Sequence, residues 1–99
     1  MKYFSLERLL DENGVVTRYP SKLGQRLSVL EYLARLFASD RAYSEQEVNE
    51  MIRLHIVYSD HVTIRRELVD FGFLIRSVDC REYRRVQELP AAASILERF

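Results

Sequence analysis

The sequence lacks the features that would point to export, a membrane span or a disulfide-stabilised fold. Its one cysteine, Cys80, excludes an internal disulfide and is typical of a protein in a reducing cytosol. No apolar run approaches the roughly 20 residues that cross a bilayer. Charge at Glu7 and Arg8 stands where an apolar signal core would lie, so we expect no export. These absences predict a cytoplasmic protein without a membrane segment.

Candidate catalytic and metal-binding groups are few and badly spaced. The three glycines form no phosphate-binding loop, and the serines have no recognisable base and orienting acid. His55 and His61 lie six residues apart, which matches no common zinc spacing, and only Cys80 is left to join them. An oxidant-sensing thiol at Cys80, beside Arg81, is one interpretation, and an incidental exposed thiol is the simpler one. We therefore expect no catalysis, no metal, no cofactor and no small-molecule substrate.

An excess of one charge is also missing, because 15 acidic residues balance 15 basic ones. A dedicated DNA-coating protein is usually strongly basic, so this balance counts mildly against nucleic acid. The charges are nevertheless sorted along the chain. Residues 39–52 hold four acids against one arginine, whereas residues 53–86 hold seven arginines against five acids. Such arginines suit phosphate binding and, equally, a surface crossed by salt bridges.

Helical periodicity dominates what the sequence does contain. Apolar residues recur on one helical face over residues 22–38, and Ser21 is a good N-cap for that helix. Ser44 and Glu47 make a capping box, which starts a second helix that runs to about residue 55. Shorter helices are expected near the two ends, over residues 5–12 and 91–99.

A third helix and a hairpin complete the expected elements. Ser59 or Asp60 caps the helix, and Gly72 ends it. Its core face is expected to hold Ile64, Leu68 and Phe71. Two short apolar runs around a polar turn, residues 73–78 and 82–86, predict a β-hairpin. The β-branched and aromatic run over residues 15–19 predicts a short strand or an extended lead.

The order helix, helix, helix, hairpin predicts an α+β winged-helix fold. In that fold three helices form the core, and the C-terminal β-hairpin, the wing, projects beside the third helix. A chain of 99 residues is short enough for a single domain. We assign residues 15–86 to the winged-helix core, residues 1–14 to an N-terminal helix and turn, and residues 87–99 to a C-terminal tail or short helix.

Several separated blocks resemble one protein family. They are residues 10–14, 19–22, 29–33, 43–50 and 65–74, which read LDENG, YPSK, VLEYL, YSEQEVNE and RRELVDFGFL. In this order they resemble the prokaryotic domain-of-unknown-function family 2087 over about residues 9–86. The resemblance implies a bacterial winged-helix-like module, found alone or attached to regulators with other DNA-binding domains, and it brings no catalytic or ligand residues. Cys80 stands where the family pattern has glycine and Arg84 where it has an aromatic residue, so we expect a more open turn and a more basic wing.

The third helix has a polar face opposite its core side, made of Ser59, Thr63, Arg66 and Asp70. In a DNA complex, Arg66 would reach a guanine edge or a phosphate, and Ser59 and Thr63 would bond phosphates. Asp70 and Glu67 oppose contact with a polyanion. The simpler alternative is a solvated helix in which Arg66 pairs with Asp70 at i,i+4.

The predicted hairpin is the better candidate for nucleic acid. It carries four arginines against Asp79 and Glu82, and arginine on a projecting wing is well placed to contact phosphates. Pairing across the strands, or protection of an exposed edge, explains the same residues equally well. The four are Arg76, Arg81, Arg84 and Arg85.

Apolar residues in the flanking helices allow a second kind of interface. They either close the chain's own core or join two chains in a homodimer. Packing within the chain is simpler for the N-terminal helix, whereas dimer contact or fraying is as plausible for the C-terminal one. These residues are Leu6, Leu9, Leu10, Ile95, Leu96 and Phe99.

Two functions therefore stay open. The first is a non-catalytic module for transcription regulation that binds double-stranded DNA through the third helix and the wing. The second is a protein-interaction domain whose partner is a second copy or another regulator protein. The neutral total and the acidic second helix favour interaction, whereas the arginine-rich hairpin favours DNA. Winged helices serve both ends, so the fold alone does not choose.

Overall fold

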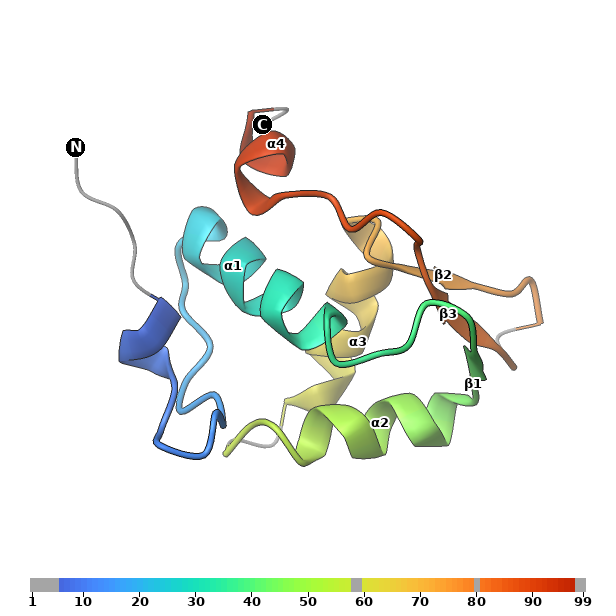
Figure 1. Ribbon diagram of the computed structural model, residues 1–99, viewed down its shortest axis with the longest axis horizontal. Coiled ribbons are helices and arrows are strands. Elements are labelled where there is room, and N and C mark those ends of the chain that lie inside the picture. The colour runs from blue at the N-terminus through green and yellow to red at the C-terminus, as the bar shows by residue number, and fades with distance from the viewer. Residues whose placement is uncertain (1–5, 58–59, 80, 98–99) are drawn as a thin grey trace.

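A computed structural model describes residues 6–57, 60–79 and 81–97 of the chain (Figure 1). Within these residues it has a mixed α+β fold of four α-helices and a three-stranded antiparallel sheet, preceded by a 3₁₀ helix. In chain order the elements are η1 (Leu6–Leu9), α1 (Leu23–Ala34), β1 (Ala42–Tyr43), α2 (Glu45–Arg53), α3 (His61–Asp70), β2 (Leu74–Arg76), β3 (Tyr83–Arg85) and α4 (Ala92–Leu96).

Helix α1 lies in the middle of the fold, with α2 below it, α4 above it and the sheet to its right in Figure 1. It is shorter than the predicted residues 22–38. The N–H groups of Leu36 and Phe37 bond carbonyls three residues back, which tightens the chain beyond the helix. Ser21 is not the N-cap; Lys22 stands there without a side-chain cap. The predicted apolar face is confirmed, and its buried residues within the helix are Leu27, Val29, Leu30, Leu33 and Ala34.

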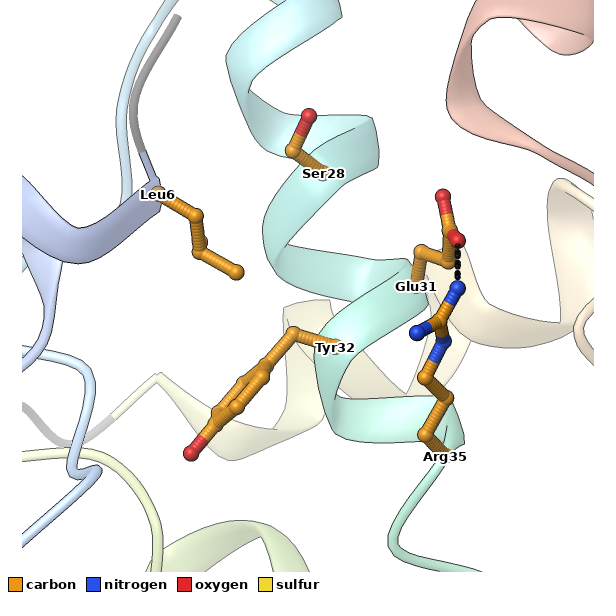
Figure 2. A pocket seen from close by; sticks show the side chains of 5 residues that line it. All are labelled: Leu6, Ser28, Glu31, Tyr32 and Arg35. Atoms are coloured by element: carbon orange, nitrogen blue, oxygen red, sulfur yellow. Dashed lines mark hydrogen bonds and ion pairs between the residues drawn. The ribbon is translucent and has the colours of Figure 1, made fainter.

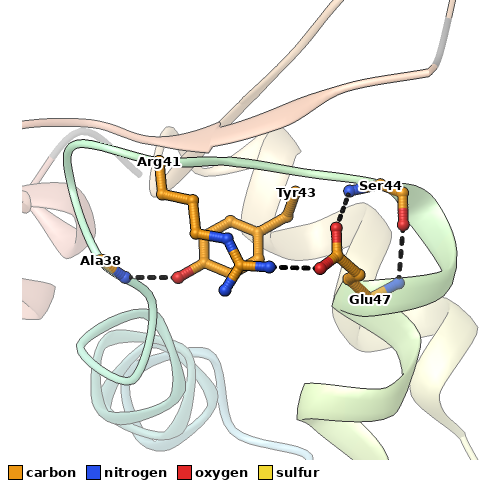
Figure 3. Close-up of polar contacts among 5 residues, drawn as sticks. All are labelled: Ala38, Arg41, Tyr43, Ser44 and Glu47. Carbon is orange, nitrogen blue, oxygen red and sulfur yellow. Dashed lines mark hydrogen bonds and ion pairs between the residues drawn. The ribbon is translucent and has the colours of Figure 1, made fainter.

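Helix α2 begins at the predicted capping box. The Glu47 N–H donates to the Ser44 hydroxyl at 3.1 Å, and the Ser44 N–H donates to the Glu47 carboxylate at 2.9 Å (Figure 3). The hydrogen bond from the Ser44 N–H to the Glu47 carboxylate is the main reason that the pKa of Glu47 lies below its ordinary value. Glu47 also pairs with Arg41, whose guanidinium lies 4.4 Å from the centre of the Tyr43 ring. The Ala38 N–H donates to the Tyr43 hydroxyl at 2.8 Å, so the cluster in Figure 3 joins the segment after α1 to the start of α2.

Helix α3 has the core face that the sequence predicts. Ile64 and Leu68 are buried, and Phe71 is partly buried against the same core. Gly72 follows with a φ of 87°, a left-handed conformation that favours glycine, and it ends the helix as predicted. Asp60 is the N-cap residue but makes no side-chain cap.

The predicted hairpin is confirmed as β2 and β3, whose strands are shorter than residues 73–78 and 82–86. Ile75 pairs with Arg84 in its register. A third strand, β1, was not predicted because two residues are too few for a periodic signal. It pairs antiparallel with β3 and gives the sheet order β1-β3-β2. The loop between β2 and β3 projects away from the helices (Figure 1).

The N-terminal segment departs from the helix predicted over residues 5–12. Of the described residues there, only those of η1 are helical. The Asp11 carboxylate turns the chain, because it accepts hydrogen bonds from two later backbone N–H groups at 2.8 and 3.0 Å. Residues 15–19 form no regular strand; Val16 makes single β-bridges to Leu10 and Ile56. The segment is thus the extended lead that the sequence allowed.

Helix α4 packs along α1 in the same chain and is shorter than the predicted tail helix. Its Ile95 is buried. The Glu31 carboxylate on α1 accepts a hydrogen bond from the Ala92 N–H at 3.0 Å, and so caps α4 from outside. The second oxygen of Glu31 pairs with Arg35 at 2.6 Å beside the hollow drawn in Figure 2. The tail is therefore fastened to the central helix.

Candidate nucleic-acid interface

Helix α3 keeps a polar face toward solvent. Arg66 and Asp70 are exposed and Thr63 is half-buried. Ser59, predicted to belong to the same face, lies outside the described residues. The opposite side of α3 contacts α1, α2 and β2, so the packing beneath fixes which side chains reach solvent.

The solvent face of α3 and the hairpin share a hollow of about 360 Å³. It is lined by Arg66, Val69 and Asp70 of α3 and by Arg76 of β2. Among the described residues, neither arginine side chain has an ion pair, and the Arg66–Asp70 pair of a merely solvated helix is not formed. Two uncompensated guanidinium groups from separate elements therefore stand at one place, where they can bind an anion or a base edge.

Glu67, the other acid expected to oppose a polyanion, is turned into the fold. Its carboxylate pairs with Arg26 of α1 and accepts a hydrogen bond from the Tyr19 hydroxyl at 2.5 Å. Arg26 also lies over the Tyr19 ring, 5.1 Å from its centre. Burial, followed by the bond to Glu67, raises the pKa of Tyr19, so the hydroxyl stays a donor. The Arg26 guanidinium compensates the charge of Glu67, and Asp70 is the acidic residue that lines the hollow.

Two further arginines are occupied by the fold. Arg65 of α3 donates to the Asn49 side chain at 2.6 Å and lies 3.3 Å from the Glu45 carboxylate, both on α2. Arg85, predicted as a phosphate contact, donates to the Phe37 carbonyl at 3.2 Å and to two carbonyls just after β3. Arg85 thus fastens the hairpin to the segment after α1 rather than standing free.

The hairpin directs its other arginines outward. Arg84 is exposed beside its register partner, Ile75, which is 60% exposed. The Arg81 side chain is 84% exposed and lies 3.8 Å from Asp79. At the tip, the Ser77 hydroxyl donates to the Asp79 carboxylate at 2.6 Å, which lowers the pKa of Asp79. This bond joins two residues that follow β2 in the chain.

A family model matches the part of the chain that contains the hollow. It is the model of domain-of-unknown-function family 2087 (DUF2087), described as an uncharacterized protein conserved in bacteria, and it matches residues 15–85. The chain belongs to the DUF2087 family. The match runs from before α1 to the end of β3 and so includes both α3 and the hairpin. No curated protein and no solved structure matches the chain.

In this DUF2087 domain, the blocks that carry the family resemblance hold the fold together. Tyr19 and Glu67 come from two separate blocks and bond each other. Ser44 and Glu47 come from a third and form the capping box. The Tyr19–Glu67 contact escaped the sequence analysis because the residues lie 48 positions apart, and no local pattern connects them.

Four of the six predicted interface residues are covered by the domain's own core. Leu96 is 43% exposed, and Phe99 lies outside the described residues. Leu9 and Ile95 are buried in that core, and Leu6 and Leu10 are partly buried against it.

The two histidines are explained by local contacts. His61 starts α3, and its Nε2 lies 3.1 Å from a guanidinium nitrogen of Arg53. Burial and the arginine charge lower the pKa of His61. His55 Nδ1 lies 2.7 Å from the Met51 carbonyl oxygen.

In the part of the chain that the structure describes, no histidine, cysteine and carboxylate groups gather as a metal site, and no helix is long and apolar enough to cross a membrane. Cys80 lies outside that part.

Proposed function

We propose that this DUF2087 domain is a non-catalytic winged-helix module that binds double-stranded DNA. In this proposal α3 lies in the major groove and the β2–β3 hairpin is the wing that follows the backbone. The order of the elements supports it, since a helix, a short strand and two helices precede the hairpin, and the short strand completes the sheet beside β3.

The observation that carries the proposal is the hollow between α3 and the hairpin. Arg66 and Arg76 line it from two elements without an ion-pair partner among the described residues. Arg84 and Arg81 extend the basic surface along the β2–β3 hairpin. Guanidinium groups match phosphate and guanine acceptors well, and phosphate contacts supply most of the affinity that does not depend on sequence.

Contacts within the chain reduce the set of residues that we propose for contact with DNA. Arg85 leaves the set because its guanidinium is engaged by backbone carbonyls. Glu67 no longer opposes DNA, since Arg26 compensates its charge. Thr63 stays as a candidate for a phosphate bond at the edge of the face. The remaining arginines are Arg66, Arg76, Arg81 and Arg84.

Fluorescence anisotropy with a labelled duplex of mixed sequence tests the proposal. The affinity should fall as salt rises, and Arg84→Gln should weaken binding about tenfold for every sequence alike and lower the salt slope by about one. Arg35→Gln, which removes an exposed charge from the C-cap of α1 beside the hollow of Figure 2, is the matched control and should change affinity little. Undetectable or salt-independent binding at low ionic strength would rule the DNA function out.

A second candidate, a protein-docking domain, is favoured by exposed apolar residues away from the hollow. Leu54 and Val57, at the end of α2 and just after it, are 72% and 63% exposed. Leu54 also lines a shallow hollow with Glu50 and Arg53. Sedimentation velocity over a range of concentrations tests association with a second copy. A dimer that dissociates in Leu54→Asp, together with absent DNA binding, would favour docking over DNA.

A further inference from the structure

Arg66 and Asp70 are opposite charges that stand one turn apart on the exposed face of α3 and do not form an ion pair. Both line the hollow beside the hairpin. Side chains at this spacing have β-carbons about 5–6 Å apart and are close enough to pair. The Arg66 guanidinium, a hydrogen-bond donor, and the Asp70 carboxylate, a hydrogen-bond acceptor, are therefore both open to a ligand in the same hollow.

The acid is the informative member of this pair. A carboxylate in a surface that binds only phosphates would weaken binding by repulsion. Glu67, one helical position from Arg66, is compensated internally by Arg26 and Tyr19, whereas no described group compensates Asp70 in this way. A carboxylate that shares the hollow with Arg66 and Arg76 suits a ligand that supplies a hydrogen-bond donor as well as acceptors.

We propose that Arg66 and Asp70 read a C·G base pair, or two adjacent pairs, in the major groove. Arg66 donates to O6 and N7 of a guanine, and Asp70 accepts from the N4 amino group of a cytosine. Successive bases rise by about 3.4 Å, so side chains one helical turn apart reach one pair or its neighbour. Arg76 holds the adjacent backbone phosphate. This inference rests on the proposed DNA function and adds its base specificity.

Selection from a random duplex library, followed by anisotropy on the selected duplex, tests this pair. The wild-type domain should prefer the selected duplex to one with T·A in place of the C·G pair by at least about fivefold. Asp70→Ala should lower that preference to the part that Arg66 supplies through the guanine, and should bind non-selected duplex at least as tightly as the wild type, because an acid has been removed from the interface. Asp70→Asn should shift the preference toward adenine, which an amide reads bidentately.

Glu82→Ala is the matched control, because it removes an exposed acid from the hairpin and should tighten all duplexes without altering the preference. A thermal melt of each variant verifies that the fold is kept. Salt-dependent binding with a preference unchanged in Asp70→Ala overturns the inference and leaves the DNA function standing. Equal weakening of every duplex by Asp70→Ala overturns it too, since Asp70 would then only support the helix. Absence of binding by the wild-type domain removes both proposals.

Discussion

Glu67 stands on the helix proposed to face DNA, yet its carboxylate bonds inward. The side chains of Arg26 and Glu67 are 28% and 17% exposed, so their pair is largely shielded from water. The Nε atom of Arg26 is buried without a hydrogen-bond partner among the described residues. The Arg26 guanidinium therefore depends on Glu67 for compensation of its charge, and the loss of either partner would leave the other uncompensated.

For this pair of side chains we predict that Glu67→Ala lowers the free energy of unfolding by about 2 kcal/mol. The loss is smaller than the roughly 3–5 kcal/mol of a broken, fully buried pair because both side chains keep some solvent contact. Urea denaturation measures the change. Asp70→Ala, an acid-to-alanine change on the solvent face of the same helix, should alter stability by less than about 0.5 kcal/mol. Equal effects of the two variants would show that the inward pair stabilises nothing.

Among the elements, α4 depends most on its neighbour. An isolated helix shorter than about 12 residues is marginal in water, so the five residues of α4 need tertiary support. Ile95 supplies that support by burial against α1, and Glu31 supplies a hydrogen-bond acceptor for the first turn. Helix α4 therefore takes its support from α1 within the single chain.

We accordingly expect Ile95→Ala to lower the free energy of unfolding by about 2–4 kcal/mol, as for other buried isoleucines. Leu96→Ala, the neighbouring residue with an exposed side chain, should cost less than about 1 kcal/mol. Thermal denaturation compares the two, and hydrogen exchange shows whether α1 loses protection when α4 detaches. If Ile95→Ala instead dissociated a dimer and left the monomer's stability unchanged, α4 would be an intermolecular element.

Over the whole molecule, the charges cancel in number but not in arrangement. The formal net charge is zero at pH 7. Several pairs neutralise each other between elements, among them Arg26 with Glu67 and Arg65 with Glu45. Arg66 and Arg76 at the hollow and Arg84 on the hairpin have no ion pair with a described acid. A basic binding surface is thus compatible with a net charge of zero, so the balanced composition does not argue against nucleic-acid binding.

Zero net charge also predicts a solubility minimum near neutral pH. Molecules without net charge repel one another least, so association is strongest there at low ionic strength. Arg84→Glu, which makes the net charge −2, should raise the solubility measured by polyethylene-glycol precipitation at pH 7. Arg84→Gln should raise it by a smaller amount. A solubility that is the same for all three proteins would show that exposed apolar residues such as Val78 control association instead.

Features that depend on neighbours a few positions away could be predicted from the sequence. The capping box of Ser44 and Glu47, the end of α3 at Gly72, and the apolar face of α1 follow from hydrogen bonds and periodicity within one or two turns. The β2–β3 hairpin follows from two apolar runs around a polar turn. The solvent face of α3, with Arg66 and Asp70, was predictable for the same reason.

Which charged side chains are engaged by the fold depends on contacts between residues that are distant in the sequence. Glu67 is compensated from 41 positions away, Arg85 bonds a carbonyl 48 positions away, and Glu31 caps a helix 61 positions away. The two-residue strand β1 likewise exists through its pairing with β3. Contacts between distant residues form only after the helices have packed, and a local pattern carries no information about them. Whether an arginine bonds within the fold or stays exposed on the surface is therefore a property of the folded chain.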